Sequence, residues 1–343
     1  MHYADFRRTL LLIVTLVVGT LGAARAEDKI LIAAAGLSKQ IHLPEVLCEK
    51  LGYFKQQGLD VEYANIGNSG VNAENQLIAG VVQAASSSYD HTIDLQSKGK
   101  YITTIVQFMA APGEAELVPT KFADRIKTWA DLKGHTLGVS GLGGMTDYLS
   151  RTLALRGGLA ANDISLLGIG ADSTFIAAMV QGQVQAGMVT DLTVSRMLDA
   201  HQAVLLSDMR TPATTLAALG APYPGDSLYV SEAWLKDHKD AAQRSANAFV
   251  LTMKWIAAHS VEEITALVPA DYYEGNRAVY VAALAQNKSM FTPDGRMPEG
   301  APQAVLKVLA AFNPTVGIKQ IDLSRTYDPS FVDTALRTVA LRN

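Results

Sequence analysis

The chain has 343 residues, 49% of them hydrophobic, and its 29 Lys and Arg residues are set against 33 Asp and Glu residues. The basic residues are scattered, which excludes a nucleic-acid-binding protein, because such proteins need clustered basic side chains. The length exceeds that of a usual single domain and predicts two lobes. A single cysteine cannot form an internal disulfide, so a hydrophobic core must stabilise the fold.

The first 26 residues have the pattern of a secretory signal peptide. Arg7 and Arg8 precede an apolar run over residues 10–18, and residues 24–26 (Ala-Arg-Ala) match the pattern that a signal peptidase reads. The apolar run is shorter than the roughly 20 residues that a membrane-spanning helix needs. We therefore predict cleavage near Ala26/Glu27 and a periplasmic mature protein. Cleavage removes three arginines and one aspartate, which leaves a formal net charge of about −6.

The only cysteine, Cys48, lies well past the predicted cleavage site, so it is not placed to carry a lipid anchor. It is either a reactive thiol or a small apolar residue on the buried face of a helix. The pattern around it favours the second interpretation.

Short β-rich runs alternate with helical patterns in the first half, as is typical of a parallel α/β sheet. Residues 110–116, with Pro112 and Gly113, are predicted to cross from the first lobe to the second. Before this crossing we predict strands over residues 29–35, 59–66, 81–85 and 101–109, and helices over residues 43–51 and 71–79.

A second α/β unit follows, and residues 219–226, rich in proline and glycine, are predicted to return the chain to the first lobe. We therefore expect lobe I to contain residues 27–111 and 224–343, and lobe II residues 112–223. In lobe II and beyond we predict strands over residues 136–140, 164–169, 186–189, 203–206 and 227–230, and helices over residues 145–156, 174–181, 192–201, 232–237, 241–258, 261–267, 277–287, 302–312 and 329–341.

Four short motifs resemble one family. Residues 49–61 (EKLGYFKQQGLDV) are similar to the G-Y/F-F-x-x-x-G-L-x-V pattern of the nitrate/sulfonate/taurine class of importer solute-binding proteins, whose superfamily includes thiamine-pyrimidine-related proteins. Residues 129–134 (WADLKG), 177–186 (AAMVQGQVQA) and 327–331 (YDPSF) also look familial, although Gln185 stands where the family usually has Asp.

The resemblance spans nearly all of the predicted mature chain. It implies a type II periplasmic-binding-protein fold, in which two α/β lobes are joined by a two-strand hinge. It also implies no cofactor, a monomer, and a membrane permease of an ATP-driven (ABC) importer as partner. It does not fix the ligand, which we expect to be small and either anionic or aromatic and heterocyclic.

The predicted binding site lies at the strand-to-helix junctions of both lobes. Ligands of open α/β sheets bind beyond the carboxyl ends of the strands, where helix N-termini present unpaired N–H groups. The same Ser and Thr residues are also suited to capping helices. The candidate residues are Ser38, Lys39, Gln40, His42, Asn68, Ser69, Ser87, Ser88, Tyr89, Ser140, Gly143, Gly144, Met145, Thr146, Ser173, Thr190 and Asp191.

Two other functions stay open. A sensory binding protein would pass its closed state to a membrane receptor instead of a permease. A pyrimidine-synthase-like enzyme of the same superfamily is opposed by the single cysteine and by the export signal. Residues 138–142 nearly match a G-x-S-x-G nucleophile motif, but Leu142 replaces the last glycine. The histidines lack metal-ligand spacing, so no metal is expected.

Overall fold

The computed structural model describes residues 28–67 and 70–340. The predicted signal peptide lies outside the described residues, as do Asn68 and Ser69. Within the described ranges, no helix combines the length and apolar character needed to cross a membrane.

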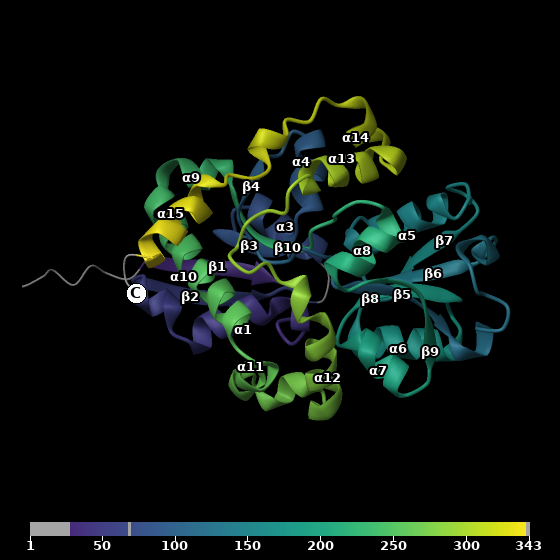
Figure 1. Cartoon of the computed structure of the whole chain (residues 1–343). Coiled ribbons are helices and arrows are strands. Elements are labelled where there is room, and N and C mark those ends of the chain that lie inside the picture. Colours follow the sequence, from purple (N-terminus) through teal and green to yellow (C-terminus); the bar gives the residue numbers. More distant parts are fainter. Residues whose placement is uncertain (1–27, 68–69, 341–343) are drawn as a thin grey trace, which may run out of the picture.

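Two mixed sheets, each covered by helices, make up the molecule (Figure 1). This arrangement confirms the predicted fold class of two α/β lobes. In the first sheet the strand order is β2-β1-β3-β10-β4, and β10 runs antiparallel to both of its neighbours. Its strands are β1 (Asp28–Ala34), β2 (Leu59–Asn65), β3 (Ala84–Ser88), β4 (Ile102–Gln107) and β10 (Asp226–Ser231).

The second sheet repeats this design in the order β7-β6-β8-β5-β9. Here β5 is the antiparallel strand, paired with β8 on one side and β9 on the other. In each sheet, therefore, the strand through which the chain enters from the other sheet is antiparallel to its neighbours. The strands are β5 (Glu114–Pro119), β6 (Thr136–Val139), β7 (Ser165–Gly168), β8 (Ala186–Thr190) and β9 (Ala203–Met209).

Helices connect the strands and then dominate the C-terminal part. Pro44 lies in the first turn of α1, where its missing N–H costs no hydrogen bond, and Gly52 takes the left-handed conformation just after that helix. The helices are α1 (Leu43–Lys50), α2 (Tyr53–Gln56), α3 (Gly70–Ile78), α4 (Asp90–Ser97), α5 (Met145–Arg156), α6 (Asp172–Gln181), α7 (Thr193–Asp199), α8 (Pro212–Leu219), α9 (Glu232–Asp237), α10 (Lys239–Ala258), α11 (Val261–Leu267), α12 (Arg277–Asn287), α13 (Ala301–Phe312), α14 (Pro314–Ile318) and α15 (Ser330–Ala340).

The sequence placed two strands incorrectly. Strand β3 covers residues 84–88 instead of 81–85, so the three serines at its end lie in the sheet and not in a loop. Strand β5 occupies part of the predicted crossing over residues 110–116. Serine and glutamate are uncommon in buried strands. Here they are held by backbone pairing with strands that come much later in the chain.

Two adjacent segments connect the sheets, residues 108–113 and 220–225. Their backbones touch: the N–H of Gly225 donates to the carbonyl of Met109 at 3.3 Å. A Cβ atom added to Gly225 would lie 2.6 Å from the carbonyl oxygen of Ala111, so only glycine fits at this point. The two connections therefore pass each other as one narrow junction.

The C-terminal helices also join the two sheets. Helix α13 packs on α4, beside the first sheet, and on α5, beside the second (Figure 1). Val305 and Leu309 of α13 are fully buried in the same hydrophobic cluster as Leu149 and Leu153 of α5. On the other side, α12 packs on α7. The two halves thus share apolar surface as well as the junction.

Candidate functional site

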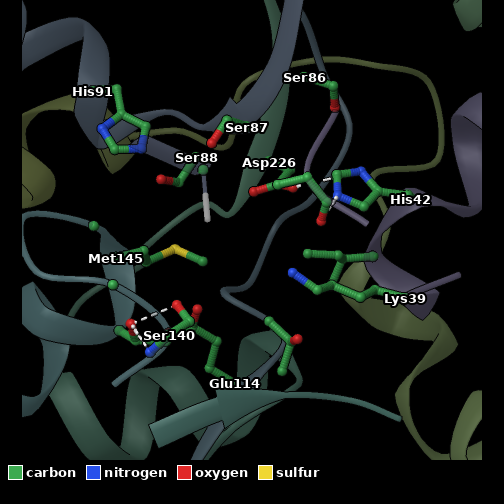
Figure 2. Close-up of a pocket in the computed structure, with 17 residues that line it drawn as sticks. Lys39, His42, Ser86, Ser87, Ser88, His91, Glu114, Ser140, Met145 and Asp226 are labelled. Atoms are coloured by element: carbon green, nitrogen blue, oxygen red, sulfur yellow. Dashed lines mark hydrogen bonds and ion pairs between the residues drawn. The ribbon is translucent and has the colours of Figure 1, made fainter. Parts of the chain in front are cut away.

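A cavity of about 50 Å³ lies between the two sheets. A water molecule needs at least about 10–15 Å³ of such space, so only a few waters fit and the halves are closely apposed. Both sheets contribute walls, at the ends of their strands and at the N-termini of α3 and α5 (Figure 2). The lining residues are Ala35, Lys39, Ile41, His42, Gly70, Ser86, Ser87, Ser88, His91, Glu114, Ser140, Gly141, Gly144, Met145, Thr146, Thr190 and Asp226.

The wall from the first sheet is a row of serine hydroxyls on β3 (Figure 2). Ser86 Oγ donates a hydrogen bond to the Glu45 carboxylate, and Ser88 Oγ donates to Asp90 Oδ1 at 2.7 Å. A Cβ atom on Gly70 would lie 2.4 Å from Ser87 Oγ, so a larger residue where α3 meets this row would force that hydroxyl to move. Because Ser86 and Ser88 already donate to these carboxylates, their oxygens remain as acceptors for a bound solute.

The wall from the second sheet is the loop between β6 and α5 with the first turn of the helix. Thr146 Oγ1 accepts a hydrogen bond from the backbone N–H of Ser140 at 3.2 Å and lies 2.9 Å from Ser140 Oγ. Asp147 accepts from the N–H of Gly143 at 2.8 Å. These contacts fix the loop and direct the positive end of the α5 dipole at the cavity, which favours hydrogen-bond acceptors and negative charge there.

Two buried histidines of the cavity wall are paired with carboxylates. His42 Nδ1 lies 3.0 Å from Glu45 Oε1, and His91 Nδ1 lies 3.0 Å from Glu74 Oε2. Burial by itself would lower the pKa of each ring, but the neighbouring carboxylates raise it, to about 9 for His91. His91 is therefore a cation at neutral pH.

Two carboxyl groups reach the cavity from opposite sheets, Asp226 from β10 and Glu114 from β5 (Figure 2). Burial raises the pKa of Asp226 to about 6, against the opposing effect of His42, which lies 3.9 Å away. Burial, together with Asp90 and Asp226, raises the pKa of Glu114 well above its usual range. Glu114 Oε2 has no hydrogen-bond partner among the described residues.

The ammonium group of Lys39 points into the cavity from the side opposite Met145 (Figure 2). The residue is only 7% exposed. Burial lowers the pKa of its ammonium group, and the carboxylates of Asp172, Asp226 and Glu114 oppose that change. The cavity therefore contains charges of both signs. No arginine is among its described lining residues.

The structure brings together nine of the predicted residues. They come from both predicted lobes, residues 39–88 from the first and residues 140–190 from the second. The nine that line the cavity are Lys39, His42, Ser87, Ser88, Ser140, Gly144, Met145, Thr146 and Thr190.

Six other predicted residues lie in the described ranges but do not line the cavity. Gln40 donates to the carbonyl of Tyr280 at 2.7 Å, and Tyr89 Oη lies 2.5 Å from Thr326 Oγ1. The N–H of Gly143 donates to Asp147 within its own loop. Ser38 is half-buried and Ser173 is exposed outside the cavity.

Asp191 is the sixth of these residues, and it holds elements together beside the junction. Its carboxylate accepts hydrogen bonds from Asn287 Nδ2 at 2.7 Å, from Arg210 Nη1 at 3.0 Å and from the backbone N–H of Ser195 at 2.9 Å. Asn287 ends α12, so this network connects the C-terminal helices to the second sheet.

Several lining residues were missed from the sequence. Glu114 follows Pro112 and Gly113, which made its segment resemble a loop, and Asp226 was assigned to the return crossing. Ile41, Gly70, Ser86 and Gly141 lie within the predicted strand-to-helix junctions but were not chosen as site residues, and His91 follows the end of one junction directly. The missed lining residues are Ala35, Ile41, Gly70, Ser86, His91, Glu114, Gly141 and Asp226.

No group of three or more potential metal-ligating side chains exists in the part of the chain that the structure describes. The cavity's carboxyl groups face serines and a lysine in place of a ring of ligands. A solute that fits here can offer hydrogen-bond donors to the carboxyl groups of Glu114 and Asp226 and an acceptor to Lys39.

The chain matches the family model described as NMT1/THI5 like over residues 39–263. A search of curated proteins finds no match. Among solved structures, a protein of Bordetella bronchiseptica RB50 is 31% identical, with a TM-score of 0.85 and coverage of 92% of this chain and 99% of that one. The periplasmic aliphatic sulphonate binding protein SsuA from Escherichia coli is 18% identical, with a TM-score of 0.67 and coverage of 89% and 99%.

An enzyme shares the fold too. The desulfurization enzyme DSZB is 16% identical, with a TM-score of 0.60, and the match covers 91% of this chain and 99% of that one. At this identity the likeness extends to the fold alone.

Proposed function

Because the chain belongs to the NMT1/THI5-like family, we propose that it is the periplasmic solute-binding component of an ABC importer. Its lobes are residues 27–111 with 224–343, and residues 112–223, after removal of a signal peptide ending near Ala26. It works as a monomer, captures a small solute between the lobes and delivers it to the permease.

The observation that carries this proposal is the cavity lined from both sheets. A solute bound there contacts both lobes at once, so its binding energy favours the closed arrangement over the open one. The two connections between the sheets lie side by side at Gly225 and Ala111, so a change in the angle between the lobes would involve both of them at one place. A permease that binds the closed shape would then distinguish the loaded protein from the empty one.

An enzymatic role has less support. Cys48, the only thiol, is fully buried in the hydrophobic core, as the sequence indicated, and does not line the cavity. Burial also raises the pKa of the thiol well above its usual range, which disfavours the reactive thiolate. The histidines that reach the cavity are engaged with carboxylates instead of a nucleophile.

The test begins with the full chain expressed in a Gram-negative host and released by osmotic shock. Intact mass should place the new N-terminus near Glu27, and a chain that stays in the cytoplasm with residues 1–26 attached would contradict export. Solutes carried through purification are then identified by mass spectrometry after denaturation. A solute present at about 100 times its dissociation constant should stabilise the protein by about 2.7 kcal/mol.

Variants connect that stabilisation to the cavity. Lys39→Ala, Ser88→Ala and Thr146→Ala should each weaken binding of the identified solute without unfolding the protein, while Ser173→Ala, at an exposed position outside the cavity, should leave binding unchanged. Unchanged affinity in all three cavity variants would rule out this site. Chemical conversion of the solute by the purified protein would rule out a purely binding role.

A further inference from the structure

Glu114 is a buried acid directed at the ligand space. Its residue is 2% exposed, it lines the cavity, and its carboxyl group points toward the centre beside Met145 (Figure 2). Oε2 has no hydrogen-bond partner among the described residues. An uncompensated buried carboxylate is costly, so such a group either stays protonated or receives a positive partner.

The charged groups around Glu114 do not supply that partner completely. Asp226 from β10 and Asp90 from α4 disfavour its ionisation, and Lys39 favours it. His42 and His91 also line the cavity, but each is paired with a carboxylate of its own. Lys39 is shared with Asp172 and Asp226. Tyr223 also interacts with Glu114, and burial raises the pKa of its hydroxyl, so it stays neutral. Negative neighbours therefore outnumber positive ones.

Resting on the function proposed above, we infer that the solute carries a positively charged nitrogen and that Glu114 binds this nitrogen as its counter-charge. The other end of the solute is an acceptor, such as a carboxylate, held by Lys39 and the N-terminus of α5. The cavity would then favour such a solute over simple anions, because an anion lacking the nitrogen forms no ion pair with Glu114.

Binding should also release a proton. The cationic nitrogen favours the ionised form of Glu114, so a carboxyl that is protonated in the empty protein loses its proton when the solute enters. Affinity for the solute should therefore rise with pH, by about tenfold per pH unit while the pH lies below the pKa of Glu114 in the empty protein.

The experiment uses matched pairs of small acids that differ only in an amino or a hydroxyl group, such as β-alanine with 3-hydroxypropionate and 4-aminobutyrate with 4-hydroxybutyrate. Calorimetry of the full-length, exported protein in two buffers with different ionisation enthalpies gives both affinity and proton release. We expect at least one amino acid to bind about tenfold or more tightly than its hydroxy partner, with release of up to one proton.

Glu114→Gln should lower the affinity for the amino acid at least about tenfold, abolish its advantage over the hydroxy acid and abolish the proton release. Glu116→Gln is the matched control, because Glu116 lies two residues along the same strand, is fully buried, accepts a hydrogen bond from Ser150 at 2.9 Å and does not line the cavity. This control should bind as the parent does at neutral pH, because burial raises the pKa of Glu116 to about 8 and the substitution then removes little charge. Thermal unfolding of both variants identifies any loss of fold.

Binding of the hydroxy acids in preference to the amino acids, a preference that survives Glu114→Gln, or no binding of any amino acid would each overturn the inference. The solute identified by mass spectrometry separates the two proposals. A cavity-bound solute without a cationic nitrogen would overturn the inference and leave the transport role standing. A protein that carries no solute and binds neither series would contradict both.

Discussion

Asp226 gives a pH-dependent prediction of stability. Its carboxyl is 4% exposed and its pKa rises from 3.8 to about 6 in the folded protein, chiefly through burial. Between these pH values the folded state holds more protons than the unfolded state, so the free energy of unfolding falls as the pH rises. The difference between the two pKa values corresponds to about 3 kcal/mol. The free energy of unfolding is higher by this amount at low pH, where Asp226 is protonated, and the whole amount is lost only above pH 6.

Asp226→Asn removes the titration and keeps the shape of the side chain. We expect it to raise the free energy of unfolding by about 3 kcal/mol at pH 7.5 and by about 1 kcal/mol at pH 4.5, relative to the parent at each pH. Urea denaturation at both pH values, followed by circular dichroism, measures this difference. The same substitution should weaken solute binding, because it removes a charge from the cavity.

Asp131→Asn provides a control of opposite sign. Asp131 is on the surface, and hydrogen bonds from the N–H groups of Lys127 and Thr128 and from the Thr128 hydroxyl lower the pKa of its carboxyl. That variant should lose stability at pH 7.5, and the loss should shrink as the pH falls through the lowered pKa. If Asp226→Asn destabilises the protein at pH 7.5, or changes stability equally at both pH values, burial does not govern the ionisation of Asp226.

Three further predictions concern other parts of the molecule. Lys39→Met should lower affinity for the solute by about tenfold or more without loss of stability, because it removes a charged donor while keeping the buried stem, and calorimetry with thermal unfolding checks both. Cys48 should resist a thiol reagent in the native protein and react at once in urea, since it is fully buried; rapid native labelling would contradict the packing around α1. Gly225→Ala should destabilise the protein by about 1–3 kcal/mol, because the added Cβ would meet the backbone of Ala111. An unchanged urea midpoint would show that the backbone shifts to make room for the Cβ at little cost.

The sequence predicted most elements in their order, because hydrophobic periodicity is a local signal, but it missed β5, α4 and α8. Helices such as α1 and α10 have apolar stripes that survive in the fold as buried faces. Strand β3 was misplaced because its serines have weak strand preference. Its position is set instead by pairing with β10, which follows it by well over a hundred residues.

The candidate site was predicted where chemistry follows a local rule, and missed where it depends on distant pairing. Ser140 and Thr146 lie at a strand-to-helix junction, a position that the general behaviour of α/β sheets marks as a binding edge. Glu114 gains its significance from β8 and β9, which flank its strand. No local pattern distinguishes it from a solvated glutamate beside a proline and a glycine.

The narrow junction bears on how such proteins recombine. Residues 112–223 enter and leave through neighbouring backbones, so a homologous segment could replace them with two closely spaced splice points. However, α5 rests on Val305 and Leu309 of α13, which belong to the recipient chain. A chimaera that transplants the segment without matching these side chains would expose apolar surface and aggregate, so domain exchange within the family is limited by a helix far downstream of the exchanged segment.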